Sequence, residues 1–92
     1  MTDKANTEAE LLQFPCRFPI KVMGRAEQQF RQDVLTIISQ HTGPIDETDI
    51  REAPSSKGNF VSLTVTIEAS SQQQLDAIYR DLTASDAVLY CL

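Results

Sequence analysis

The chain of 92 residues has room for one domain with one core, and its 41% hydrophobic and 23% charged content excludes disorder throughout. No apolar run approaches the ~20 residues that span a membrane, and residues 1–10 are polar and acidic, unlike a signal peptide, so we expect a cytoplasmic protein without a membrane partner. The net charge of −5 disfavours nucleic-acid partners, because an acidic domain gains little from counterion release.

The first quarter of the chain contains a polar segment followed by a strand pattern. Residues 1–12 show no sustained apolar pattern, which predicts a flexible tail before a single domain over residues 13–92. Within residues 17–23, apolar side chains recur at every second position, and this period of two predicts the first strand. We expect Gly24 to end that strand.

The next predicted element is a helix over residues 26–41, followed by the stop signal Gly43-Pro44. His41 is the single histidine and falls at the helix C-terminus, where a polar or cationic ring offsets the helix dipole. We therefore assign it a capping role rather than general-base catalysis. The apolar residues recur at helical spacing and form one stripe, made of Ala26, Phe30, Val34, Ile37 and Ile38.

Two strand patterns follow, joined by a loop over residues 54–59. Residues 48–53 are charged around Ile50, which is typical of an edge strand protected against pairing with other chains. Residues 60–69 alternate without interruption, which predicts a half-buried strand. The set expected to face the helices is Val61, Leu63, Val65, Ile67 and Ala69.

A second helix is predicted over residues 72–83 and a final strand over residues 88–92. Ser70 or Ser71 is positioned to cap this helix, with a glutamine three residues on. The order strand, helix, strand, strand, helix, strand is the ferredoxin-like α+β arrangement, βαββαβ. It predicts a four-stranded antiparallel sheet of order 4-1-3-2 with both helices on one face.

The loop before the third strand brings hydroxyls, a cation and a glycine together. Backbone amides near a glycine turn, with these groups, would hold a small anionic metabolite through its carboxylate or phosphate. The alternative is an ordinary hairpin loop in which the glycine takes a positive φ angle. It is not a P-loop, because the lysine precedes the glycine. The candidate ligand-binding residues are Ser55, Ser56, Lys57 and Gly58, with Lys21 from the first strand.

The sheet face away from the helices is expected to be uncovered. Its candidate interaction residues are Met23, Phe60, Ser62 and Thr64. RNA-recognition domains of this topology stack bases on several aromatic side chains, whereas Phe60 is the one aromatic residue expected here, so nucleic acid is disfavoured. The mixed surface suits a second copy in a homodimer, a partner protein, or simply water and the N-terminal tail.

The residues indicate no catalytic or metal site. No nucleophile is evidently paired with the single histidine, and the acids in residues 46–52 lack the spacing of a calcium loop, so we expect no enzyme activity, no metal and no cofactor. Cys16 and Cys91 form no zinc motif and are expected as free thiols. Because the first and last strands would be antiparallel neighbours, the Cα atoms of these cysteines are predicted to lie within about 10 Å.

Several segments together resemble a known family. Phe14-Pro15, Phe18, residues 21–24, and residues 54–59 followed by an aromatic residue are similar to motifs of the YbeD-like family of small bacterial proteins. The resemblance covers about residues 11–92 and implies a ferredoxin-like domain similar to the ACT domains that sense small molecules. The family's usual name implies a link to lipoate regulation, with no catalytic residues to carry over. Phe60 departs from the family, where tyrosine is common.

The leading hypothesis is thus a non-catalytic regulatory or small-ligand-binding module linked to lipoate metabolism. The alternative is a protein–protein interaction adaptor that docks through the open sheet face at Met23 and Phe60. An enzyme ranks last, since no acid, base and nucleophile are evidently grouped.

Overall fold

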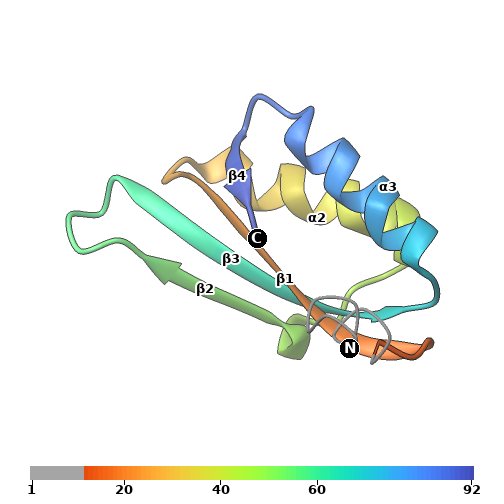
Figure 1. The fold of residues 1–92 in the computed structure, drawn as a ribbon. Coiled ribbons are helices and arrows are strands. Elements are labelled where there is room, and N and C mark those ends of the chain that lie inside the picture. The colour runs from red at the N-terminus through yellow and green to blue at the C-terminus, as the bar shows by residue number, and fades with distance from the viewer. Residues whose placement is uncertain (1–11) are drawn as a thin grey trace, which may run out of the picture.

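The fold comes from a computed structural model that describes residues 12–92, so the tail expected over residues 1–12 lies almost wholly outside the described residues. None of the helices in this part of the chain is long and apolar enough to cross a membrane. The elements follow the predicted order with one short 3-10 helix added (Figure 1): β1 (Cys16–Arg25), α2 (Gln28–Thr42), η1 (Glu47–Asp49), β2 (Ile50–Pro54), β3 (Phe60–Ala69), α3 (Gln72–Thr83) and β4 (Val88–Cys91).

The four strands form one antiparallel sheet in the order β2-β3-β1-β4. This is the predicted order 4-1-3-2, so the prediction of a ferredoxin-like α+β fold is confirmed. Both helices lie on one side of the sheet (Figure 1), and no helix or strand within residues 12–92 covers the other side, which we call the open face. Alternation along the two central strands, β1 and β3, therefore divides their side chains between the core and the open face.

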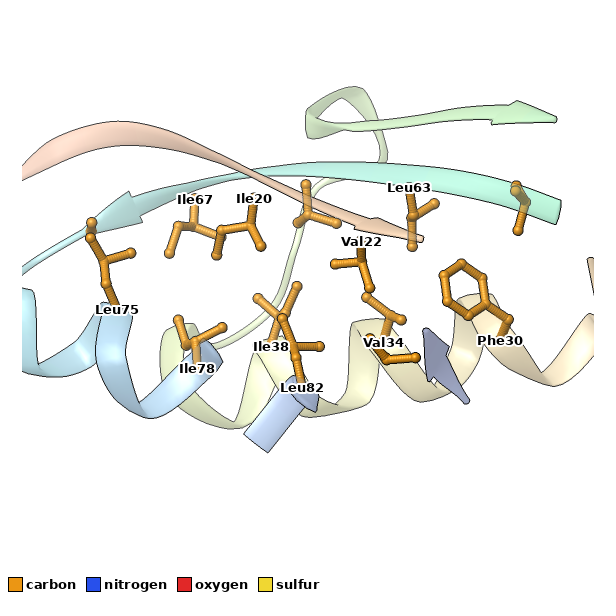
Figure 2. Close-up of a cluster of buried hydrophobic side chains, with 14 residues drawn as sticks. Ile20, Val22, Phe30, Val34, Ile38, Leu63, Ile67, Leu75, Ile78 and Leu82 are labelled. Carbon is orange, nitrogen blue, oxygen red and sulfur yellow. The ribbon is translucent and has the colours of Figure 1, made fainter. Parts of the chain in front are cut away.

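The core fills the space between the sheet and the two helices (Figure 2). Each aliphatic side chain buried there contributes about 1.5–3 kcal/mol relative to an exposed position. No polar or charged residue in the described part of the chain is buried. The large side chains with no exposed surface are Ile20, Val22, Val34, Ile38, Leu63, Val65, Ile78 and Leu82.

Strand β1 is longer than predicted, because Gly24 lies inside the strand instead of ending it. The strand continues to Arg25, which pairs with the first residue of β3. A Cβ at position 24 would lie 2.3 Å from the Phe30 ring and 2.7 Å from the carbonyl oxygen of Ala87. Glycine is therefore required here by close packing of α2 and the β4 connection, and not by a turn.

Two further boundaries differ from the prediction. Helix α2 begins at Gln28, and Ala26 is exposed before it instead of joining the apolar stripe. The second strand is preceded by η1, because the Asp46 carboxylate accepts hydrogen bonds from the backbone N–H and the hydroxyl of Thr48. Both hydrogen bonds lower the pKa of Asp46, and the bond from the backbone N–H has the larger effect. A local cap thus replaces the expected start of the edge strand.

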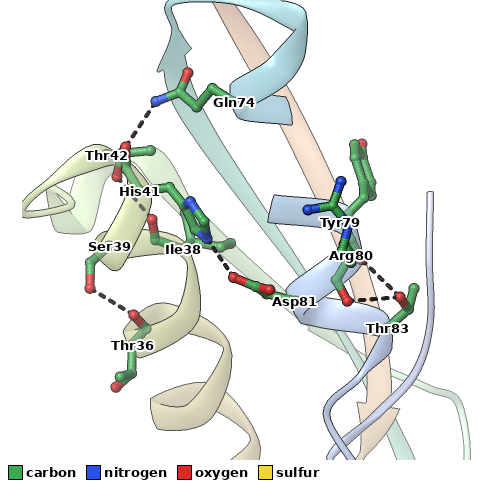
Figure 3. A network of polar contacts seen from close by, with 10 residues as sticks. All are labelled: Thr36, Ile38, Ser39, His41, Thr42, Gln74, Tyr79, Arg80, Asp81 and Thr83. Carbon is green, nitrogen blue, oxygen red and sulfur yellow. Dashed lines mark hydrogen bonds and ion pairs between the residues drawn. The ribbon is translucent and has the colours of Figure 1, made fainter. Parts of the chain in front are cut away.

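Polar contacts join the two helices to each other on the covered side of the sheet (Figure 3). Ser71 Oγ accepts from the Gln74 N–H at 3.1 Å, so the predicted serine cap is confirmed. The Gln74 side chain donates to the His41 carbonyl oxygen at 2.9 Å, while the His41 ring contacts Asp81 at 2.7 Å. His41 lies in the last turn of α2 as expected, and its ring joins α2 to α3.

Candidate functional site

The loop between β2 and β3 uses two of its candidate residues to close the hairpin. Ser55 Oγ accepts from the Phe60 N–H at 3.2 Å, and the Ser55 N–H donates to the Phe60 carbonyl at 2.8 Å. The Gly58 N–H donates to the Ser55 carbonyl at 3.0 Å, with Gly58 at a φ angle of 76°. The hydroxyl of Ser55 and the amide of Gly58 are thus engaged within the turn itself, while Ser56 and Lys57 are exposed.

Lys21 does not join this loop. It pairs with Thr64, four positions along β1 from the Arg25–Phe60 pair next to the loop, which corresponds to about 13 Å. The cation beside the loop is Arg25, which lines a hollow of about 380 Å³ with Ala26, Glu27, Gly58, Asn59 and Phe60. The sequence marks Arg25, with Arg17, Lys21 and Lys57, as a candidate for a local basic patch, but ending the strand at Gly24 left Arg25 without a place beside the loop. Continuing the alternation through the glycine places Arg25 on the open face.

The four candidate interaction residues all lie on the open face. Met23 pairs with Ser62, and Lys21 pairs with Thr64, so these side chains share the side opposite the buried residues. Phe60 lies diagonally across from Met23, within reach of an aromatic ring, and is 40% exposed.

Strand β4 adds a second aromatic residue to this face, which corrects the expectation that Phe60 is the only one. Tyr90 pairs with Met23 and is 51% exposed, and Leu92 pairs with Lys21 through backbone hydrogen bonds of 2.8 and 3.4 Å. The register shifts between Met23 and Gly24, so simple alternation could not assign the faces of β4. We call Met23, Phe60 and Tyr90 the apolar patch.

Basic side chains surround the apolar patch. Every charged residue at an outward position of the four strands is basic except Glu68, which pairs with Arg17 near the start of β1. Arg17 forms an ion pair with Asp49, and this hydrogen-bonded contact raises the pKa of Arg17. The outward basic residues are Arg17, Lys21, Arg25 and Arg51.

The two cysteines lie far apart, so the prediction that they are close is wrong. Cys91 pairs with Val22, whereas Cys16 pairs with Ala69 at the opposite end of β1. Cys16 and Val22 are six positions apart along β1, which corresponds to about 20 Å. The strand order was correct, but β4 has only four residues and pairs with the C-terminal half of β1. Both cysteines are free thiols, and burial raises the pKa of Cys91.

A larger hollow lies elsewhere, between α2 and residues 44–45. It measures about 540 Å³ and includes Arg31, Leu35, Ser39 and Ile45 in its lining. No group of three or more potential metal ligands occurs within residues 12–92. The hollow coincides with neither the loop nor the apolar patch.

These observations define a ferredoxin-like α+β domain whose distinctive surface is an open basic sheet face around an apolar patch. The chain belongs to the family described as Protein of unknown function (DUF493), which matches residues 9–92. This confirms the resemblance seen in the sequence motifs. This chain is 40% identical over 84 residues to a UPF0250 protein of Paraburkholderia phytofirmans, and the match covers 91% of this chain and 94% of that one. It is 42% identical over 92 residues to a UPF0250 protein of Janthinobacterium sp., covering 100% of both chains.

A solved structure shares the fold. The solution structure of protein HP0495 from H. pylori is similar, with a TM-score of 0.68, and the match covers 100% of this chain and 97% of that chain. The sequence identity is 14%, so this likeness supports the architecture and nothing finer.

Proposed function

We propose that this protein is a non-catalytic interaction module that docks a partner protein on its open face. The apolar patch carries the proposal, because Phe60 and Tyr90 are half exposed on either side of Met23 while paired strands hold their backbones. Exposed aromatic residues and methionine are enriched at protein interfaces, where they bury a large area. The interaction-adaptor hypothesis therefore replaces small-ligand regulation as the leading one.

The loop supports a small-ligand site less well. A site for a small molecule usually encloses most of its ligand and offers unengaged polar groups. Here Ser55 and Gly58 already bond within the turn, and Lys21 lies about 13 Å along β1 from the pair next to the loop. The hydrogen bonds within the loop support the alternative of an ordinary hairpin loop.

The link to lipoate metabolism enters this proposal as the identity of the partner. It comes only from the resemblance to the YbeD-like family, and it would make the partner an enzyme that forms or transfers the lipoyl group. Regulation would then follow from occupancy of the open face, without any reaction on this chain.

Affinity capture with matched variants tests the docking site. Phe60→Asp and Tyr90→Ser alter the apolar patch, whereas Gln73→Asp alters an exposed position on α3. The captured partner is identified by mass spectrometry, purified and tested again for binding to this protein. We expect both patch variants to lose this binding and Gln73→Asp to keep it. Thermal melts establish that each variant folds. Equal binding by wild type and both patch variants would exclude the open face.

A titration addresses the small-ligand alternative separately. The ¹⁵N-labelled protein is titrated with lipoate, octanoate, serine and inorganic phosphate, and we expect the amide signals of residues 55–59 to stay in place. Saturable shifts confined to these residues would instead support an anion-binding module.

A further inference from the structure

We infer that the partner segment docked on the open face is acidic, with carboxylate side chains placed around an apolar anchor residue. This inference rests on the proposed function and names the chemistry of the partner. It comes from the distribution of charge over the sheet, from the positions of three cations around the apolar patch, and from a polar hollow at one edge.

The charge of the open face is opposite to that of the chain. The net charge is −5, yet the outward strand positions carry basic residues and a single acid, Glu68. Glu68 and Arg17 are paired residues, and Arg17 also forms an ion pair with Asp49, so this end of the sheet is largely balanced. Within residues 12–92, Lys21, Arg25 and Arg51 form no ion pair. Positive charge is thus concentrated at the other end, beside the apolar patch.

The three cations flank the apolar patch in a defined pattern. Lys21 and Arg25 are the outward neighbours of Met23 along β1, one on each side of it. Arg51 pairs with Thr64, which also pairs with Lys21, so the two cations lie in one row across three strands with their Cα atoms about 10 Å apart. An apolar centre with a charged rim is the usual layout of a protein interface, and complementary charge gives it specificity.

A polar hollow lies beside Arg51 at the edge of this pattern. It measures about 430 Å³, and its lining combines two guanidinium groups and threonine hydroxyls with one carboxylate, that of Asp49, which is already paired with Arg17. A carboxylate placed there would meet hydrogen-bond donors from Arg51, Thr64 and Thr66. The lining residues are Arg17, Thr48, Asp49, Ile50, Arg51, Thr64 and Thr66.

An acidic protein segment fits this face better than a nucleic acid does. Phe60 is on β3 and Tyr90 on β4, with Met23 of β1 between them, so the rings do not form the paired platform on adjacent central strands that stacks successive bases. Single-stranded nucleic acid would share the attraction to the cations, and it is therefore an arm of the test.

The test uses three probes on the ¹⁵N-labelled protein. These are a synthetic glutamate-rich peptide with one central leucine, the same peptide with lysine in place of glutamate, and oligothymidylate. We expect the acidic peptide alone to shift the amides of Lys21, Met23, Arg25 and Thr64. A triple variant with Lys21→Gln, Arg25→Gln and Arg51→Gln should bind it roughly tenfold more weakly, since three exposed ion pairs are lost. The control Arg80→Gln on α3 should bind it as wild type does.

Three results would overturn the inference: no response to the acidic peptide, an equal response to the lysine peptide, or tighter binding of oligothymidylate at the same residues. Binding of the purified partner to the variants distinguishes failure of the acidic-segment inference from failure of the docking proposal. If Phe60→Asp abolishes partner binding while the triple glutamine variant binds normally, docking stands and the acidic chemistry is wrong. If neither variant changes partner binding, the open face is not the docking site.

Discussion

The two faces of the sheet are made by the same strands and differ at every second residue. Leu63 is completely buried against the helices, while Ser62 and Thr64 on either side of it are partly exposed on the open face. One set of positions supplies the folding free energy, because burial of apolar area dominates stability. The alternate set contributes little to the core and is therefore available for recognition.

The comparison also holds for charge. The helix-covered face buries no polar or charged residue of the described chain, whereas the open face carries Lys21, Arg25 and Arg51 around the apolar patch. Substitutions on the two faces should therefore have separable effects: a change on the covered face lowers stability, and a change on the open face alters binding while the fold persists.

The largest expected effect comes from truncating the covered face. Leu63→Ala should lower the free energy of unfolding by about 2–5 kcal/mol, because it removes a fully buried side chain and leaves a cavity. The neighbouring Thr64→Ala faces the other side, and its cost should be about 1 kcal/mol or less. Urea denaturation of both variants measures the contrast. Similar losses for the two substitutions would contradict the assignment of faces.

Gly24→Ala should have the next largest effect. Its added methyl group would lie 2.3 Å from the Phe30 ring and 2.7 Å from the Ala87 carbonyl, so we expect a loss of about 1–3 kcal/mol from overpacking. In a Phe30→Leu background, Gly24→Ala should cost less than it does in the wild type, because the clash with the ring is gone. The cost should not vanish, because the clash with the Ala87 carbonyl remains. Thermal melts of the four proteins provide the comparison. Full tolerance of the alanine would mean that glycine is not required by packing.

Most of the fold could be predicted because hydrophobic periodicity is a local signal. The alternation from Phe60 to Ala69 and the helical stripe of α3 gave the bounds of β3 and α3 as the structure has them. The strand order then followed from element order and crossover handedness. The end of β1 was misplaced because Gly24 was interpreted as a stop signal, whereas its role is to make room for a ring from α2 that no local pattern reveals.

The candidate site was less predictable, because it depends on register and on hydrogen bonds. The open face at Met23 and Phe60 followed from alternation, but Tyr90 was missed because an irregularity in the β1–β4 ladder changes the face of residues in a short strand. Composition alone could not show that Ser55 Oγ bonds to the Phe60 N–H, which changes a candidate ligand group into part of a turn.

A smaller effect is expected on the outer side of the helical layer, where His41 and Asp81 connect the two helices at 2.7 Å. A double-mutant cycle with His41→Gln and Asp81→Asn should give a coupling free energy of about 0.2–1 kcal/mol, as for partly exposed polar pairs. Partner binding on the open face should be unchanged in all three variants. Loss of partner binding at unchanged stability would show that the two sides are not independent.

The smallest effect is expected at the cysteines: Cys16 begins β1, whereas Cys91 ends β4 and pairs with Val22, six positions further along β1. Mild oxidation of the folded monomer should leave the intact mass and the melting temperature unchanged, because about 20 Å between their positions exceeds the bridging range.

Burial raises the pKa of Cys91 in the folded chain, so the thiol form is favoured there. The stability that this provides is complete below the unfolded pKa and is lost as the pH rises through the folded one. Alkylation of native and unfolded protein across alkaline pH should therefore show Cys91 reacting more slowly when folded. An intramolecular Cys16–Cys91 disulfide would contradict the register of β4, and with it the placement of Tyr90 beside Met23.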